Sequence, residues 1–146
     1  KSILYLAVEK RNFDIVKLLL EKPNIDVNYK SSKVCLYCKY TFRKTNKTIL
    51  YEAVANGCFD IVQLLLKNPN INVNETSLLS VSFDFENGDY IKCKTPLHEA
   101  ILNGFTNIIE ILLNNEKIDL NITDENKKKP IEITDDEKII SLFKKH

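Results

Sequence analysis

The sequence predicts an all-α solenoid of helix-turn-helix units with two short β-hairpin extensions. Three observations lead to this fold class. Similar segments recur in one fixed order along the 146 residues, which is typical of repeat architectures. The second half of each segment is apolar on almost every side, so it needs neighbours to bury it. Two inserts between the segments alternate apolar and polar residues, with the period of a β-strand.

The first helix of each unit is predicted from three matching runs, residues 2–8, 48–54 and 95–101. Each run opens with Ser or Thr, whose side chain can accept a hydrogen bond from a free amide at a helix N-terminus. In the third run Pro96 takes the first helical position, where its missing N–H does no harm. We therefore expect each unit to begin with a short, capped helix.

The turn that ends each first helix contains glycine in two of the three units. Asn56-Gly57 and Asn103-Gly104 stand at this place, and glycine readily adopts the left-handed conformation that helix C-termini favour. The matching pair in the first unit is Lys10-Arg11. A residue with a side chain is therefore expected at positive φ there, at a cost of about 1 kcal/mol or more.

The second helix of each unit carries almost no polar residues. Lys17, Gln63 and Glu110 are the interruptions in the three apolar runs, and such a helix is buried between neighbours rather than lying on a surface. A tag that starts with Ile and ends with Asn closes each unit. These helices are expected at residues 13–20, 59–66 and 106–113, and the tags at residues 25–28, 71–74 and 118–121.

The C-terminal tail is predicted to form a partial capping unit. Residues 130–133 repeat the first-helix pattern, and residues 135–145 form a more polar last helix. Its acids come first and its lysines last, as the helix dipole favours. The predicted units are residues 1–47 with an insert at about 29–47, residues 48–94 with an insert at about 75–94, residues 95–128, and the cap at residues 129–146.

The third unit carries the motif of a known family. Its run T-P-L-H-E-A at residues 95–100, followed by Asn103-Gly104, resembles the ankyrin signature T-P-L-H-x-A. The first two units lack the proline and have Tyr5 and Tyr51 in place of the histidine. In the family the threonine and histidine hydrogen-bond locally, so the resemblance implies a less rigid turn in those two units. The ankyrin resemblance covers nearly the whole chain except the inserts.

The bulk properties exclude several classes of partner. The net charge is +1, from 21 basic and 20 acidic residues, which gives no reason to expect nucleic acid or an anionic membrane as the partner. No apolar run approaches the roughly 20 residues of a membrane-spanning helix. The chain opens in the body of a helix at Lys1, so we interpret it as an excerpt of a longer cytoplasmic protein, with its four cysteines reduced.

Both inserts are predicted to form β-hairpins on one face of the stack. In the second, alternation starts at Leu79 and Asn87-Gly88 marks a turn. A three-residue loop there would place Val81 opposite Cys93. The first insert alternates over residues 34–42 but lacks a glycine turn.

The two inserts carry opposite charge. Six basic residues and no acid lie between positions 30 and 47, whereas four acids and two lysines lie between positions 75 and 94. We expect the hairpins to attract each other and to form a small extended sheet. The alternative is that the basic, tyrosine-rich edge captures an acidic partner.

The ankyrin resemblance implies a module that binds another protein through its hairpins and the exposed ends of its first helices. On the hairpins we select aromatic and basic residues, which dominate interface energies. The candidates are Glu9, Lys10, Ala55, Asn56, Leu102 and Asn103 at the helix ends, and Tyr37, Lys39, Tyr40, Arg43, Phe83, Phe85 and Tyr90 on the hairpins.

Two other functional classes compete with this interpretation. One is a structural segment of a longer array, in which the hairpins pair only with each other. The other is a zinc-stabilised or nucleic-acid-binding module, because Cys35 and Cys38 have the gap of a zinc-ligand pair, with Cys93 or His98 to complete a site. On a strand, however, Cys35 and Cys38 point to opposite faces. We therefore expect ordinary thiols and no metal or cofactor.

The sequence does not predict an enzyme. No nucleophile stands beside either histidine, and no glycine-rich phosphate loop follows a predicted strand. Paired acids at a fixed spacing on a helix face, which general acid–base chemistry would need, are also missing from the sequence. We therefore expect no small-molecule substrate.

Overall fold

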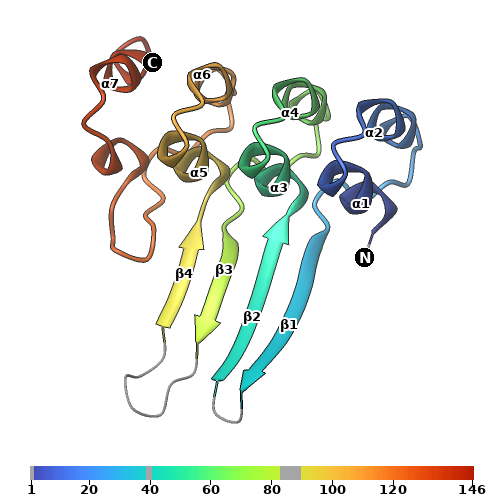
Figure 1. The fold of residues 1–146 in the computed structure, drawn as a ribbon. Coiled ribbons are helices and arrows are strands. Elements are labelled where there is room, and N and C mark those ends of the chain that lie inside the picture. Colours follow the sequence, from blue (N-terminus) through green and yellow to red (C-terminus); the bar gives the residue numbers. More distant parts are fainter. Residues whose placement is uncertain (1, 39–40, 83–89) are drawn as a thin grey trace.

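The computed structural model of the chain describes residues 2–38, 41–82 and 90–146. Pairs of helices stack side by side, and a sheet projects from the inner row (Figure 1). Inner helices α1, α3 and α5 lie between the sheet and the outer helices α2, α4 and α6 (Figure 1). Their bounds are α1 Ile3–Glu9, α2 Phe13–Leu20, α3 Ile49–Ala55, α4 Phe59–Leu66, α5 Pro96–Leu102 and α6 Thr106–Leu113. The predicted all-α solenoid is confirmed.

Two of the three predicted helix caps are present. The hydroxyl of Thr48 accepts a hydrogen bond from the Tyr51 amide at the start of α3, and Thr95 accepts one from the His98 amide at the start of α5. Ser2 occupies the same position before α1, but its side chain makes no capping hydrogen bond. The first unit therefore begins with the weakest helix start.

The turn after each inner helix is left-handed. The φ angles are 56° at Arg11, 65° at Gly57 and 68° at Gly104. The predicted positive φ at a residue with a side chain is therefore confirmed, and Arg11 carries it. Since a side chain in this conformation costs about 1–2 kcal/mol, the first unit has a strained turn that the other two avoid.

Alanine substitutions at these three turn positions should therefore differ in cost. Arg11→Ala should change the free energy of unfolding by less than about 0.5 kcal/mol, because the backbone penalty is already present. Gly104→Ala should cost about 1 kcal/mol, with open space around the new methyl group. Gly57→Ala should cost more, since its Cβ would lie 3.0 Å from the Phe105 ring. Urea unfolding measures all three free energies. Equal costs would contradict the left-handed conformation at Arg11 and the close contact of Gly57 with Phe105.

The outer helices α4 and α6 are buried between neighbours, as predicted. Ile61 in α4 and Ile108 in α6 are 2% and 1% exposed. In α2, by contrast, Val16 is the buried residue, while Ile15 and Leu18 are 43% and 60% exposed. The prediction of a buried second helix is wrong for the first unit, because no described residue covers the side of α2 that faces away from α4.

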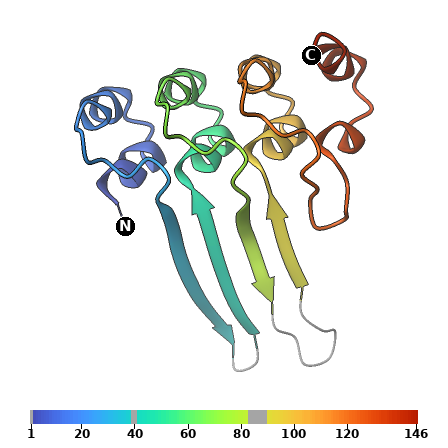
Figure 2. The ribbon, with the colours of Figure 1, turned by 180° about the vertical axis from the view of Figure 1, so that it is seen from behind.

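The sheet contains strands β1 (Lys30–Cys38), β2 (Thr41–Thr48), β3 (Ser77–Ser82) and β4 (Tyr90–Lys94), in that order and all antiparallel. Pairs β1/β2 and β3/β4 are the two predicted hairpins. Strand β2 pairs with β3, for example at Lys44 and Val81. The hairpins thus form one extended sheet, as the opposite charges of the inserts suggested, and the same arrangement appears from behind in Figure 2.

The predicted register of the second hairpin is wrong. Val81 pairs with Ile91, and Cys93 pairs with Leu78. The prediction counted outward from a three-residue loop, but the observed pairing of Val81 is already shifted by two residues, and an irregularity between Leu78 and Ser80 shifts the pairing once more at the base of the hairpin. Such a bulge leaves no clear mark in an alternating sequence.

Asparagine side chains bridge consecutive units through the closing tags. The last asparagine of a tag donates its side-chain amide to a backbone carbonyl of the next unit, and its side-chain oxygen accepts a backbone amide two residues further on. Both bonds resemble a short piece of strand pairing. Asn28 bonds Asn70 O at 2.7 Å and Asn72 N at 2.8 Å, and Asn74 bonds Lys117 O at 2.6 Å and Asp119 N at 2.8 Å.

Two further helical segments pack on the C-terminal side of the third unit. They are the 3-10 helix η1 (Pro130–Ile133), which packs on α5, and helix α7 (Glu137–Phe143), which packs on α6. Asp136 caps α7, and Ile139 joins the common core at 2% exposed. Within the described ranges, no helix has the length and apolarity needed to cross a membrane.

Candidate protein-interaction surface

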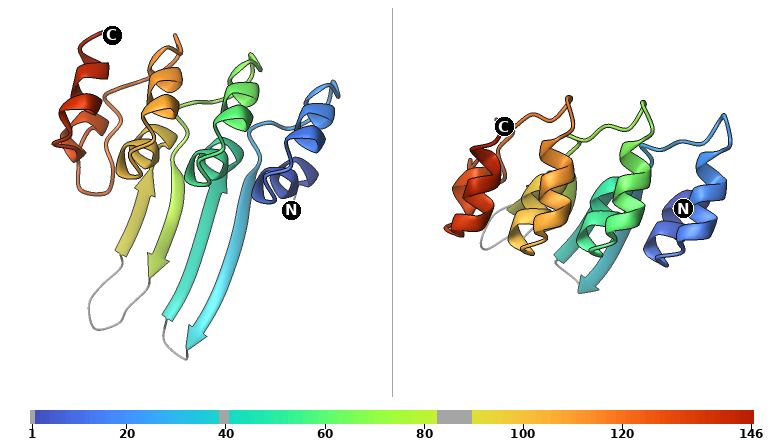
Figure 3. Two further views of the ribbon diagram at one scale, coloured as in Figure 1. Left: turned by 45° about the horizontal axis from the view of Figure 1, so that its top comes forward. Right: turned by 90° about the horizontal axis from the view of Figure 1, so that it is seen from above.

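The C-terminal ends of the inner helices form a row along the stack, because these helices lie side by side (Figure 3). At this row Lys10, Leu102 and Asn103 are exposed, while Glu9, Ala55 and Asn56 are half-buried. Leu102 is 53% exposed at the end of α5. All six helix-end candidates therefore reach the surface.

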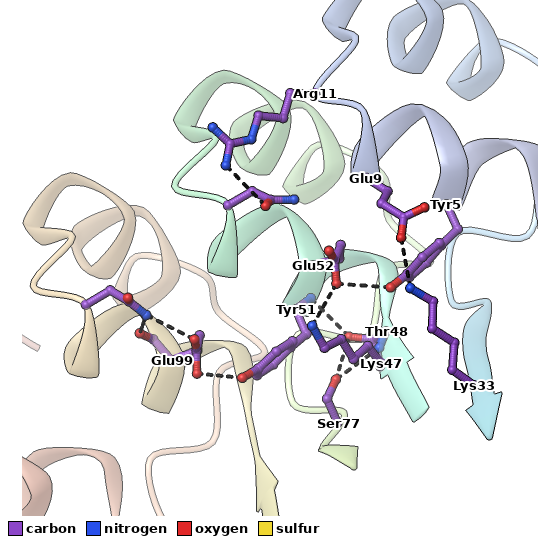
Figure 4. A network of polar contacts seen from close by, with 12 residues as sticks. Tyr5, Glu9, Arg11, Lys33, Lys47, Thr48, Tyr51, Glu52, Ser77 and Glu99 are labelled. Atoms are coloured by element: carbon purple, nitrogen blue, oxygen red, sulfur yellow. Dashed lines mark hydrogen bonds and ion pairs between the residues drawn. The ribbon is translucent and has the colours of Figure 1, made fainter. Parts of the chain in front are cut away.

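Several of these polar side chains already have partners within the chain (Figure 4). Lys33 in β1 forms an ion pair with Glu9 at 3.1 Å. The guanidinium of Arg11 donates to Asn56 at 3.4 Å, and the Asn103 amide donates to its own helix at the carbonyl and carboxylate of Glu99. A partner at this row would therefore meet a pre-ordered polar surface with Leu102 as its main apolar element.

Tyrosine–glutamate hydrogen bonds link the inner helices of successive units. The hydroxyl of Tyr5 donates to Glu52 at 3.0 Å, and that of Tyr51 donates to Glu99 at 2.5 Å (Figure 4). Lys47 adds an ion pair to Glu52 at 3.3 Å. The tyrosines are only 1% and 2% exposed, and burial raises the pKa of each phenol. Sequence reasoning missed this ladder, although each glutamate stands at the same place in its unit.

His98 occupies the same position in the third unit, where it is buried. Its Nε2 lies 3.1 Å from the carbonyl of Lys128, which can only accept, so Nε2 carries the proton. Its Nδ1 then accepts from the Thr95 hydroxyl at 2.7 Å. Burial lowers the pKa of the ring and outweighs the hydrogen bond to Lys128. Since both nitrogens have partners, His98 is not placed to bind a metal.

No metal site is found among the residues that the structure describes. No group of three or more His, Cys, Asp or Glu side chains there could hold an ion. Cys58 and Cys93 are half-buried free thiols, and burial raises the pKa of both. Neither thiol is activated for reaction, because a nucleophilic cysteine needs a lowered pKa.

Comparisons with known proteins agree with this geometry. A family model described as "Ankyrin repeats (3 copies)" matches residues 1–77, and one described as "Ankyrin repeats (many copies)" matches residues 50–113. The chain belongs to the ankyrin repeat family. The predicted family is thus confirmed, and ankyrin repeats are in general modules for protein interaction.

A solved ankyrin structure has the same fold. It is the ankyrin repeat domain of Bcl-3, described as a unique member of the IkappaB protein family, with a TM-score of 0.66 and 21% sequence identity. The match covers 97% of this chain and 50% of the Bcl-3 chain, so this chain spans about half of that structure. At this identity the likeness concerns the fold alone. A search of curated protein sequences finds no match.

The hairpin candidates of this ankyrin chain are placed less completely than those at the helix ends. Tyr37 lies in β1, Arg43 lies in β2 and pairs with Cys35 and Ser82, and Tyr90 lies in β4. Lys39, Tyr40, Phe83 and Phe85 lie outside the described residues.

Several basic residues of the first insert form ion pairs within the ankyrin stack. Lys30 pairs with Glu75 of the second unit, Lys33 with Glu9 and Lys47 with Glu52. These pairs bind strand β1 to α1 and the first hairpin to the second unit. They reduce the positive charge that the first insert could offer to an acidic partner.

Acid should destabilise this ankyrin stack through His98. The pKa of the buried ring lies below its unfolded value of about 6.5, so the unfolded chain takes up the proton first. Stability is therefore lost as pH falls from about 6.5 toward the folded pKa. Urea unfolding between pH 8 and pH 5 measures this loss.

His98→Gln should be less stable at pH 8, because two hydrogen bonds change, but its stability should vary less between pH 6.5 and pH 5. His146→Gln removes the other histidine, which is exposed at the terminus, and serves as the control. If the free energy of unfolding of His98→Gln varies with pH as steeply as that of the unmodified protein, His98 is not the group responsible.

Proposed function

We propose that this ankyrin chain binds a partner protein through the face formed by its inner helices and its sheet. Leu102 carries the proposal, because it is 53% exposed on that face. The other large, exposed apolar side chains of the described residues all belong to α1 and α2. An apolar residue surrounded by ordered polar groups fits the centre of an interface with a polar rim.

The polar side chains along the helix row support the same face. Asn103 is held against Glu99 by two hydrogen bonds, and Glu9 is held by Lys33. Groups fixed in advance lose little conformational entropy when a partner docks. The partner expected here is a folded protein or an extended segment with an apolar side chain for Leu102.

A test compares two leucines of similar exposure. The chain carrying Leu102→Glu or Leu18→Glu is immobilised, and recovery of the protein that the unmodified chain captures is measured, followed by titration with that purified partner. Leu102→Glu should weaken binding about tenfold or more, as for an interface anchor. Leu18→Glu, on the outer helix α2, should leave binding unchanged. Equal recovery by both variants would contradict the proposal.

The hairpins need a separate test. Replacing most of each hairpin by a short turn removes the candidate residues on the sheet but keeps the helix row. If the hairpins contact the partner, this variant should bind more weakly than the unmodified chain. Equal binding would exclude the hairpins and leave the helix row as the binding surface.

A structural segment of a longer array is the second candidate function. The pairing of β2 with β3 and the Lys30–Glu75 ion pair favour it, because they show the hairpins contacting each other. Under this alternative neither Leu102→Glu nor hairpin removal should change capture of any protein.

A further inference from the structure

The first unit has an apolar face on the side away from the rest of the stack. Ile3 and Leu6 of α1 are 62% and 38% exposed, and Ile15 and Leu18 of α2 are 43% and 60% exposed. Ile3, Leu6 and Ile15 line one shallow hollow together with Lys10. Single exposed apolar residues are ordinary, but a contiguous group marks a surface for contact.

The positions of Ile3 and Ile15 are buried wherever a unit precedes them, and the position of Leu18 is half-buried there. Ile49 stands where Ile3 does and is 0% exposed, and Ile61 stands where Ile15 does and is 2% exposed. The preceding unit covers them, since α1 packs on α3 and α2 packs on α4. The open face of the first unit therefore continues an interface that the stack already uses twice.

The loop before the first hairpin also exposes residues at positions that are bonded to the preceding unit elsewhere in the stack. The side chain of Asn28 donates a hydrogen bond to the backbone carbonyl of Asn70 and accepts one from the backbone amide of Asn72. In the first unit the matching residues are Asn24 and Asp26, which are exposed. An asparagine at the end of a preceding tag could form the same two bonds there.

The sheet also continues toward this side. Strand β1 is at the edge of the sheet, and an edge strand presents backbone groups to which another strand can pair. Strand β2 leads directly into α3, and β4 leads into α5 (Figure 1). A strand that led into α1 in the same way would lie along the open edge of β1.

We propose that this face binds one further ankyrin repeat with its hairpin, and that the repeat presents an apolar residue, not a tyrosine, to Leu6. The helix face and the loop match what units two and three present to the unit before them, and the strand edge matches what unit two presents to unit one. This surface shares Lys10 with the helix row that carries the proposed function but is otherwise separate from it.

Leu6 decides the chemistry of the contact. It stands where Glu52 and Glu99 accept tyrosine hydroxyls from the preceding unit. A tyrosine buried against Leu6 would have a hydroxyl without that acceptor, and an unpaired buried hydroxyl is unfavourable. An apolar side chain would instead extend the contact.

The test adds a repeat of known sequence. A copy of residues 48–93 is fused in front of Lys1, which aligns with Lys94, with either Tyr or Phe at the position that copies Tyr51. Amide hydrogen exchange of α1 and α2 is then compared with the unfused chain. We expect at least about tenfold slower exchange in the fusion with Phe, and less protection in the fusion with Tyr. Adding Leu6→Glu should reverse that order, since it restores the acceptor.

Matched substitutions locate the contact. Ile3→Lys with Leu18→Lys should change the urea midpoint of the unfused chain little, but it should abolish the added protection in the fusion. No added protection in either fusion would overturn the proposal, and equal protection with Tyr and Phe would overturn the apolar contact at Leu6. If sedimentation shows a dimer of the unfused chain that Leu18→Lys dissociates, the occupant is a second copy and the proposal is wrong.

Discussion

Replacing isoleucine by alanine at one repeated position should destabilise the protein by very different amounts in the three units. Ile61→Ala and Ile108→Ala should each cost about 2–5 kcal/mol, because these side chains are 2% and 1% exposed and their removal leaves a cavity. Ile15→Ala should cost less than about 1 kcal/mol, since Ile15 is 43% exposed. The three residues share one position on their helices, so neighbours alone account for the difference.

Urea unfolding followed by circular dichroism measures this series. The two-state assumption needs a check with a second probe, because repeat arrays can unfold unit by unit. In that case Ile61→Ala should destabilise the second unit and both of its interfaces. A cost at Ile15 equal to that at Ile61 would mean that α2 is covered in solution. Small costs at Ile61 and Ile108 would contradict the stacked core itself.

Features set by neighbouring residues could be predicted from the sequence. The caps at Thr48 and Thr95 and the turns at Gly57 and Gly104 depend on a few adjacent residues, and each recurs at the same place in its unit. The strained Arg11 followed from alignment with those glycines. Repetition supports such predictions but does not guarantee them, since Ser2 stands at the same place as the two threonines and makes no capping hydrogen bond.

Features set by distant residues were harder to predict. The exposure of Ile15 depends on what lies beside α2, and α2 by itself reads like α4 and α6. The tyrosine–glutamate ladder joins residues 47 or 48 positions apart. An alignment of the units could have suggested it, because Glu52 and Glu99 stand at one repeated position and Tyr5 and Tyr51 stand at another. For the candidate surface, exposure at the helix ends could be predicted from the sequence, but the ion pair between Glu9 and Lys33 could not.

Alkali should destabilise the stack through Tyr5 and Tyr51. Burial raises the pKa of both phenols above the ordinary value of about 10. Above pH 10 the unfolded chain loses these protons first, so stability falls as pH rises from about 10 toward the folded pKa. Each tyrosine should contribute up to about 1.4 kcal/mol per pH unit. Unfolding midpoints in urea between pH 8 and pH 12 measure the loss.

The stability of the double variant Tyr5→Phe, Tyr51→Phe, relative to the unmodified protein, should differ between the two ends of this pH range. At pH 8 it should be less stable by about 1.5–3 kcal/mol for each lost hydrogen bond, because Glu52 and Glu99 lose a donor. As pH rises its disadvantage should shrink, since it has no phenol to ionise at these positions. Lysine and cysteine titration is common to both proteins and cancels in the difference.

Tyr29→Phe is the control for the alkaline series, because it removes the hydroxyl of the half-buried ring that contacts Tyr5 edge-on at 6.1 Å. Its unfolding midpoints are measured over the same pH range as those of the double variant. If the double variant and the wild type lose stability in parallel above pH 10, the ladder tyrosines are not the groups that titrate. His98 stands at the matching position of the third unit, so one position of the repeat would limit stability in acid and in alkali. The two limits differ because imidazole must gain a proton to become charged, whereas a phenol must lose one.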